Sequence, residues 1–267
     1  MTHGTAVRLA LGSVAVIAIL ALSAPTGAAQ DSPLDRAREE AKTFKLLSDA
    51  DLYCSIFILG DERPEIKILS AERGDEKVLL SDTDLCFINK GAADGIALDQ
   101  VYLVVEAGPD VVDTFGGHNL GALGQKRGRA RVVAVDDERS TVRLEKCCGQ
   151  VMVGHYLVPF TAKDVVLGQE RGIEPAPLEG QGISGRIIYL ENTLEQVGTN
   201  YWAIINLGNE HGLAPGQQVI AFRRVRDEVP RQAVANLVVI DVGMSWATVK
   251  VLTAKDVLRV GTEVQTR

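Results

Sequence analysis

The sequence predicts a mainly β protein with two tandem small antiparallel β-barrel or sandwich modules, preceded by a signal peptide and a short N-terminal helix. One motif occurs twice: residues 88–96 read INKGAADGI and residues 205–213 read INLGNEHGL. Each copy is followed by short apolar runs and closes on a Val-Gly pair, at 153–154 and at 260–261. From residue 51 onward, apolar residues alternate with polar ones or form runs of strand length. We therefore expect a duplicated β unit.

The first 29 residues have the three parts of a secretory signal peptide. A weakly basic start precedes an apolar run at residues 9–22 and the small-residue stretch APTGAA at residues 24–29. The alternative is a retained membrane anchor, but the run is shorter than the roughly 20 residues that a spanning helix needs. We expect cleavage after Ala29, export to the periplasm or cell envelope, and no membrane span in the mature chain.

Residues 30–50 predict a helix followed by a short linker. Ser32 and Pro33 form an N-cap and first-turn pair, and acidic residues come early while lysines come late. The strands of the first module, residues 51–163, are expected at 52–59, 65–71, 77–80, 85–89, 101–105, 130–135 and 141–144. Strands of the second module, residues 183–267, are expected at 183–190, 201–205, 219–222, in a run that ends at Asp241, and at 247–251. Each module has about five strands in its repeated core, enough to close a small barrel.

Two irregular stretches separate these strands. Residues 164–182 contain repeated Gly and Pro without a sustained period, which indicates a linker between the modules. Residues 107–125 form a Gly-rich insertion in the first module, and the second module has a shorter one at 223–232.

The repeated glycines indicate turns. We expect Gly91, Gly95, Gly208 and Gly212 to adopt positive φ where a strand leaves the core and returns, with Gly216 in a further turn. The alternative is a glycine loop that binds phosphate. In these loops, however, no Lys-Ser/Thr pair follows, and the next segment resembles a strand rather than the start of a helix.

Four cysteines in an exported chain predict disulfide bonding. Cys147 and Cys148 are adjacent, and a ring between them would be strained. We expect Cys54 to bond to Cys147 or Cys148, with Cys86 buried or paired to the remaining one. A metal site built from Cys147, Cys148 and His155 is the alternative, but it lacks a C-x-x-C spacing and a fourth ligand nearby.

The charge balance excludes one broad class of partner. The formal net charge is −7, which gives no electrostatic reason to bind nucleic acid. Basic residues do gather at Arg127 and Arg129 and again at Arg223 and Arg224. We interpret them as cations that protect strand edges, and the alternative is a surface for an anionic envelope polymer.

Enzymatic motifs are sparse. The mature chain contains three histidines, His118, His155 and His211. None lies in a His-Glu-x-x-His motif, and there is no Gly-x-Ser-x-Gly. The best candidate for a hydrolytic or metal site is the loop from Asp110 to Asn119, which includes Asp113 and His118. An outer-membrane barrel is disfavoured because the strands are shorter than the ~10 residues that such barrels use.

The repeated element has a recognisable form: Ile-Asn-x-Gly-x-x-x-Gly, a strand, an insertion, and a Val-Gly-hydrophobic close. It resembles the small barrel at the C-terminal end of flagellar assembly protein T and is similar to the β-domains of rod-shape-determining protein C. Exported bacterial proteins with such modules in tandem are also similar. The resemblance covers residues 52–267 and supplies no catalytic residue.

The resemblance implies a non-catalytic binding or scaffold protein of the periplasm or envelope, without a cofactor. Its expected partner is an envelope protein or a cell-wall polymer. Such a partner would belong to the cell wall, the flagellum or a secretion system. The alternative is an envelope hydrolase or metal-binding protein that uses the loop between Asp110 and His118.

Overall fold

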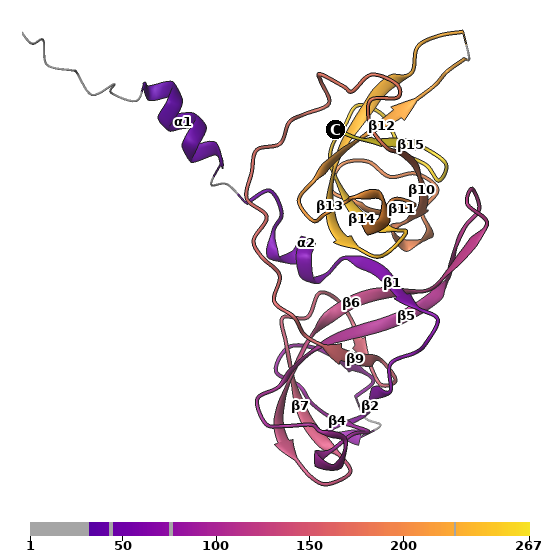
Figure 1. Cartoon of the computed structure of the whole chain (residues 1–267). Helices are drawn as coiled ribbons and strands as arrows, with labels where there is room; N and C mark the ends of the chain where they lie inside the picture. The colour runs from indigo at the N-terminus through magenta and orange to yellow at the C-terminus, as the bar shows by residue number, and fades with distance from the viewer. Residues whose placement is uncertain (1–31, 43–44, 75–76, 227) are drawn as a thin grey trace, which may run out of the picture. The chain divides into compact units, whose positions relative to one another are not determined.

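A computed structural model of the chain describes residues 32–42, 45–74, 77–226 and 228–267 (Figure 1). The predicted signal peptide at residues 1–29 lies outside the described residues. The chain divides into two units, Met1–Arg38 and Glu39–Arg267. Within the described residues, no helix is both long enough and apolar enough to cross a membrane.

The N-terminal helix is α1 (Pro33–Lys42). Ser32 caps it: the Ser32 Oγ accepts a hydrogen bond from the Asp35 backbone N–H at 3.1 Å. The predicted cap and helix are therefore confirmed.

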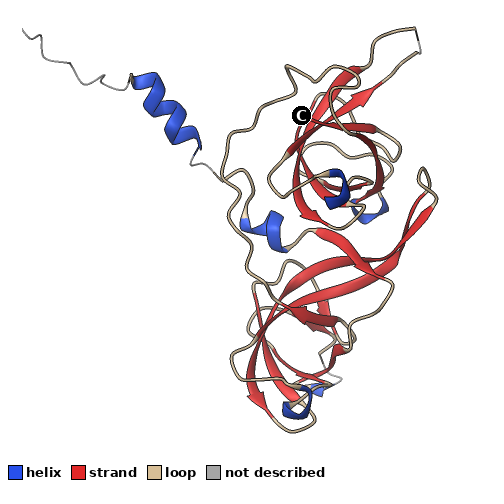
Figure 2. Ribbon diagram, in the orientation of Figure 1, coloured by secondary structure: helices blue, strands red, loops and turns tan. Residues whose placement is uncertain are grey.

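The regular structure of the second unit is mainly antiparallel β-sheet (Figure 2). Its first part contains α2 (Asp49–Tyr53), β1 (Ile56–Gly60), β2 (Ile66–Ala71), β3 (Leu79–Leu80), β4 (Leu85–Ile88), β5 (Val101–Asp113), β6 (His118–Val135), β7 (Ser140–Glu145), β8 (Val151–Met152) and β9 (Tyr156–Pro159). Its second part contains β10 (Ser184–Leu190), β11 (Trp202–Ile205), β12 (Gln218–Arg223), β13 (Gln232–Val242), β14 (Ala247–Ala254) and β15 (Glu263–Thr266). Single 3-10 turns lie at Ala92–Asp94, Glu191–Thr193 and Asn209–His211.

The two parts share one barrel topology. The second part is a closed barrel in the order β10-β11-β14-β13-β12-β15. In the first part β9 pairs with β2, and β6 pairs with both β5 and β7, so the order β2-β4-β7-β6-β5-β9 also closes. Each barrel thus has six strands rather than about five. The short closing strands after the Val-Gly pairs, β9 and β15, are the strands that the repeat count omitted.

Each barrel has its own apolar core. Alternate side chains point inward because successive residues of a strand face opposite sides of the sheet. The first core is centred on fully buried side chains of β2, β4, β6 and β7, including Ile68, Ile88, Val132 and Val142. The second includes Ile187, Ile205, Leu237 and Val249 from the corresponding strands.

The predicted positive φ is confirmed at two of the four glycines of the motif. Gly95 and Gly212 have φ of +85° and +73°, where a side chain would be strained. Gly91 and Gly208 instead have φ of −133° and −139°, so the expectation of positive φ is wrong for them. They are needed for close packing. A Cβ on Gly91 would lie 2.5 Å from Asp137 O, and one on Gly208 would lie 2.6 Å from Trp246 N.

The asparagine of the motif joins the turn to the leading strand of its barrel. Asn89 Oδ1 accepts from the Lys67 N–H at 2.7 Å, and Asn206 Oδ1 accepts from the Arg186 N–H at 2.6 Å. The Val-Gly close is repeated as well, since Gly154 and Gly261 have φ of +91° and +92°. The duplication therefore extends from sequence to individual hydrogen bonds.

The insertion at residues 107–125 is a β-hairpin arm rather than a Gly-rich loop. It continues β5 and β6 beyond the first barrel, and β1 pairs along it from Ile56↔Gln125 to Gly60↔Ala122. Pro109 and the glycines do not end the strands because bulges between 104 and 112 absorb them. Val111 and Leu123 of the arm pack with residues of β1 and of the second barrel, namely Ile56, Ile58, Ile188 and Ile204.

The strand predicted at residues 52–59 begins as helix α2. Ser48 and Asp51 form a capping box, in which Ser48 Oγ accepts from the Asp51 N–H at 3.2 Å and Asp51 Oδ2 accepts from the Ser48 N–H at 2.8 Å. Leu47 and Leu52 pack against Val238 and Ile240 of the second barrel. The segment before β1 thus fastens to the barrel that comes last in the sequence.

Candidate binding groove

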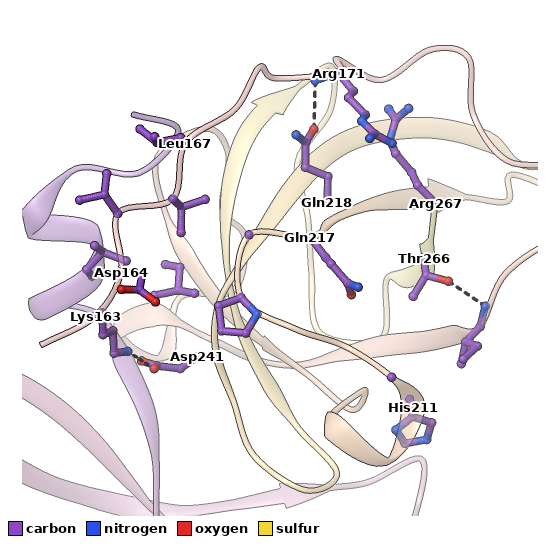
Figure 3. Close-up of a pocket in the computed structure, with 18 of the residues that line it drawn as sticks. Lys163, Asp164, Leu167, Arg171, His211, Gln217, Gln218, Asp241, Thr266 and Arg267 are labelled. Atoms are coloured by element: carbon purple, nitrogen blue, oxygen red, sulfur yellow. Dashed lines mark hydrogen bonds and ion pairs between the residues drawn. The ribbon is translucent and has the colours of Figure 1, made fainter. Parts of the chain in front are cut away.

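A groove of about 1080 Å³ lies beside the second barrel (Figure 3). One wall is the strap, which we define as residues 162–171 at the end of the first barrel and the start of the predicted linker. The opposite wall comes from the second glycine turn and from β12, β13 and β15. The lining residues are Leu52, Ala162, Lys163, Asp164, Val165, Val166, Leu167, Arg171, Ile183, His211, Gly212, Pro215, Gly216, Gln217, Gln218, Ile240, Asp241, Thr266 and Arg267.

The strap is fixed by hydrogen bonds although it has no regular secondary structure. Val166 O accepts from the Leu46 N–H at 2.8 Å. Gln218 makes two bonds to the strap backbone: its Oε1 accepts from the Arg171 N–H and its Nε2 donates to Gln169 O, each at 3.0 Å. These bonds therefore hold the strap against β12 and against the segment before α2.

Exposed apolar side chains stand along the groove. Val165 is 46% exposed, Leu167 55% and Ile183 44%. Large apolar side chains in contact with water are common singly, but their gathering in one groove is typical of a binding site. Covering them would remove apolar surface from water.

A buried ion cluster closes one end of the groove. Asp241 of β13 pairs with Lys126 of β6 at 2.5 Å and also with Lys163 of the strap. Lys126 is only 4% exposed and donates further to Leu52 O at 3.0 Å and Ser55 Oγ at 2.8 Å. The cluster joins both barrels and the strap.

The charges of this cluster perturb one another. Burial lowers the pKa of Lys126 to about 8, with Asp241 acting against that shift and Lys163 adding to it. Burial acts to raise the pKa of Asp241, but the two ammonium groups outweigh it, so the net pKa lies below the usual range. Asp241 is therefore ionised at neutral pH and holds the two lysines together.

Two guanidinium groups lie at the other end of the groove. Arg171 from the strap and Arg267 after β15 approach each other there (Figure 3). Arg267 donates to Pro175 O at 3.3 Å and to Gly172 O, whereas its buried Nε has no hydrogen-bond partner. Across the described chain, neither arginine forms an ion pair with an acidic side chain.

His211 lines the groove but is already engaged in the turn. Its Nδ1 accepts a hydrogen bond from the Gly208 N–H at 3.1 Å. Asp94 occupies the same place in the first barrel, where its Oδ2 accepts from the Gly91 N–H at 3.2 Å. The geometry gives His211 a capping role, as its position in the repeat indicates. The neighbouring Gly216 has φ of +86° and turns the chain into β12, as expected.

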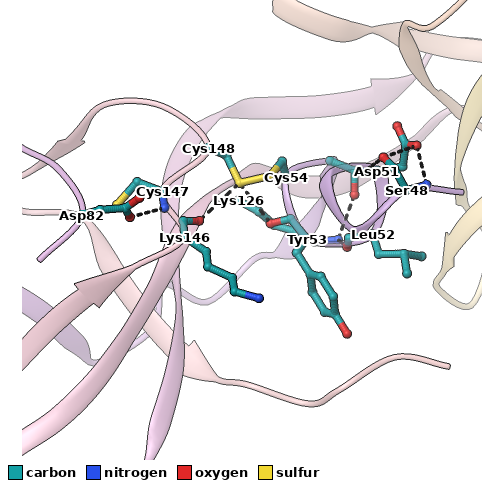
Figure 4. Close-up of a disulfide and its surroundings, with 11 residues drawn as sticks. Ser48, Asp51, Leu52, Tyr53, Cys54, Asp82, Lys126, Lys146, Cys147 and Cys148 are labelled. Carbon is teal, nitrogen blue, oxygen red and sulfur yellow. Dashed lines mark hydrogen bonds between the residues drawn. A yellow bond between two sulfur atoms is a disulfide. The ribbon is translucent and has the colours of Figure 1, made fainter. Parts of the chain in front are cut away.

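The expected disulfide is present as Cys54–Cys148 (Figure 4). Its Cα atoms are 5.6 Å apart, and it joins the segment after α2 to the segment after β7. Cys86 is a buried free thiol, and Cys147 is a half-buried one. Burial raises the pKa of each thiol to about 12, with Asp82 adding to the effect at Cys147, so both remain protonated and unreactive at neutral pH.

The four arginines of the sequence analysis do not form one surface. Arg127 pairs with Glu106, Arg223 with Asp256 and Arg224 with Glu179. The Arg129 guanidinium lies 4.2 Å from the Tyr53 ring centroid and 4.5 Å from that of Phe160. Arg127 and Arg129 lie on β6, whereas Arg223 and Arg224 lie at the end of β12.

The loop between Asp110 and Asn119 is the tip of the hairpin arm. Asp110 Oδ2 accepts from Asn119 Nδ2 at 3.2 Å, and Asp113 accepts from Asn206 Nδ2 at 3.0 Å and from the Phe115 N–H at 2.9 Å. Asp113 therefore docks the arm on the second barrel. His155 is buried elsewhere, with Nδ1 accepting from the Met152 N–H at 3.3 Å.

The described residues contain no group of three or more His, Cys, Asp or Glu side chains placed to hold a metal ion. Sequence reasoning did not find the groove. Its lining comes from segments around residues 52, 162–171, 211–218, 240 and 266, which only the folded chain brings together. Neither a protein-family model nor a curated protein matches this chain.

Proposed function

We propose that this chain is an exported, non-catalytic binding or scaffold protein of the cell envelope, and that its partner binds in the groove beneath the strap. The observation that carries the proposal is the groove itself. Its walls are held by internal hydrogen bonds, and its exposed apolar side chains remain open to a partner.

Two further observations support the envelope location. The first 29 residues have the pattern of a signal peptide, and a Cys54–Cys148 disulfide fits an oxidising compartment. The likeness of the tandem modules to envelope proteins without catalytic residues agrees with a binding role. An envelope protein or a cell-wall polymer is therefore the expected partner.

The experiment is affinity capture from a solubilised envelope fraction with three forms of the immobilised chain. Val165→Trp places a bulky ring in the groove. Leu178→Trp makes the same change at a side chain that is 67% exposed and does not line the groove. The proposal predicts that one species is captured by the wild type and by Leu178→Trp and is lost with Val165→Trp. Equal capture by all three forms would place the binding surface elsewhere, and capture by none would remove the proposed function.

A further inference from the structure

We propose that the groove binds an extended peptide segment, with the peptide's terminal carboxylate held by Arg171 and Arg267. This inference rests on the proposed binding function and specifies the ligand class.

Arg171 and Arg267 provide the binding site for the carboxylate at one end of the groove. Two guanidinium groups that approach each other without an acidic partner repel, and an oxyanion between them relieves that repulsion. Arg267 is half-buried, and burial together with the charge of Arg171 lowers its pKa. Its Nε is also buried without a partner. A carboxylate matches the planar donor geometry of guanidinium groups and can accept from both.

The charges at the opposite end give the ligand a direction. Asp241 neutralises Lys163 there, and Asp164 is an exposed carboxylate in the groove lining. In the part of the chain that the structure describes, Asp164 forms no ion pair. With Lys126 included, the charges at the Asp164 end sum to zero, whereas two guanidinium groups lie at the arginine end, so an anion is attracted to the arginine end.

The space between the two ends fits a chain rather than a single anion. A volume of about 1080 Å³ lies just above the 300–1,000 Å³ typical of small-ligand sites. Val165, Leu167 and Ile183 offer apolar contacts along it. The Gln217 Oε1 already accepts from the Ala214 N–H at 3.1 Å, and its Nε2 can donate to a peptide carbonyl. A groove with exposed apolar side chains, one donor amide and one cationic end is complementary to the last residues of an apolar peptide.

The test is an NMR titration of the ¹⁵N-labelled chain that follows the Arg Nε–Hε signals and the backbone amides of the groove. Three probes are added: a pool of apolar tetrapeptides with free C-terminal carboxylates, the same pool with C-terminal amides, and inorganic phosphate. The variant is Arg171→Gln, whose backbone bond to Gln218 is retained. The matched control is Arg224→Gln, an exposed arginine outside the groove.

The carboxylate pool is expected to shift the Arg171 and Arg267 signals. Amidation of the pool should weaken binding at least tenfold, because a charge-assisted hydrogen bond contributes about 1.5–3 kcal/mol. Arg171→Gln should weaken it by a similar factor, and Arg224→Gln should leave it unchanged.

Three outcomes overturn the inference. Equal binding of the carboxylate and amide pools would show that the groove binds peptides but that the arginine pair does not recognise their terminal carboxylate. The proposed binding function would then stand. Saturation by phosphate with no additional effect of the peptides would show a simple anion site. No binding of either pool would exclude apolar peptides, and the capture experiment then decides separately whether the groove binds any envelope component.

Discussion

Gly208 is predicted to be less tolerant of alanine than Gly212, although only Gly212 has positive φ. A Cβ on Gly208 would lie 2.6 Å from Trp246 N and closer still to Met244 O, so the turn must move away from the β13–β14 connection. That movement breaks the bonds from the Asn209 N–H to Gly243 O and from the Glu210 N–H to Met244 O, at 2.9 Å and 3.1 Å.

The magnitude follows from these contacts. Each lost hydrogen bond costs about 0.5–1.5 kcal/mol, and forcing an extra carbon into a packed site costs about 1–3 kcal/mol. Gly208→Ala should therefore destabilise the second barrel by about 2–6 kcal/mol. A Cβ on Gly212 meets no atom within 4 Å, so Gly212→Ala carries only the cost of the left-handed backbone, about 1–2 kcal/mol before the gain from a stiffer unfolded chain.

The assay is urea unfolding followed by tryptophan fluorescence. The two tryptophans of the chain, Trp202 and Trp246, both belong to the second barrel and report its unfolding. If Gly212→Ala is as costly as Gly208→Ala, or if Gly208→Ala is neutral, close packing is not the reason for the glycine at 208. Loss of small-anion binding with unchanged stability would favour the ligand-loop alternative.

Three other predictions concern the turns, the ion cluster and the disulfide. In the first barrel Gly91→Ala should be more destabilising than Gly95→Ala. Far-UV circular dichroism during denaturation measures both, and the reverse order would show that the two glycine turns are not packed in the same way. Asp241 has a lowered pKa, so its stabilisation is present above the unfolded value of about 3.9 and is lost as pH falls below it. Asp241→Asn, which leaves two lysines without their partner, should cost about 3–5 kcal/mol at pH 7 and much less at pH 2–3, and a cost independent of pH would refute the ionised cluster. Replacing both Cys54 and Cys148 by Ser should lower the free energy of unfolding by about 2–4 kcal/mol. If full reduction of the wild-type protein changes neither its mass nor its stability, no such bond forms.

The sequence predicts the repeated turns of this fold and misses the hairpin arm and the strap, which do not repeat. The Ile-Asn-x-Gly-x-x-x-Gly motif identifies both turns because its asparagine and glycines make the same contacts in each barrel. Asp99 shows a limit of the pattern: it has φ of +63° at the place that Gly216 occupies in the second barrel, so a turn is kept without its glycine.

The hairpin arm and the strap were beyond sequence reasoning for a physical reason. Glycine and proline usually end strands, yet bulges and pairing with β1 keep the arm extended, and its apolar residues are buried by β1 and by the second barrel. The sequence of the strap has no regular alternation of apolar and polar residues. Its backbone bonds to side chains such as Gln218 rather than to the backbone of a neighbouring strand. Local patterns carry no signal for such long-range contacts.

The most direct test of the groove as the binding site is photo-cross-linking in intact cells of the native host. A benzophenone side chain replaces Leu167, which is 55% exposed on the groove, or Met244, which is 70% exposed on the β13–β14 connection outside it. Adducts are then compared by mass after irradiation. If the partner binds in the groove, we expect a defined adduct from position 167 that Val165→Trp abolishes, and none of the same mass from position 244. No adduct at 167, or the same adduct at both positions, would contradict it.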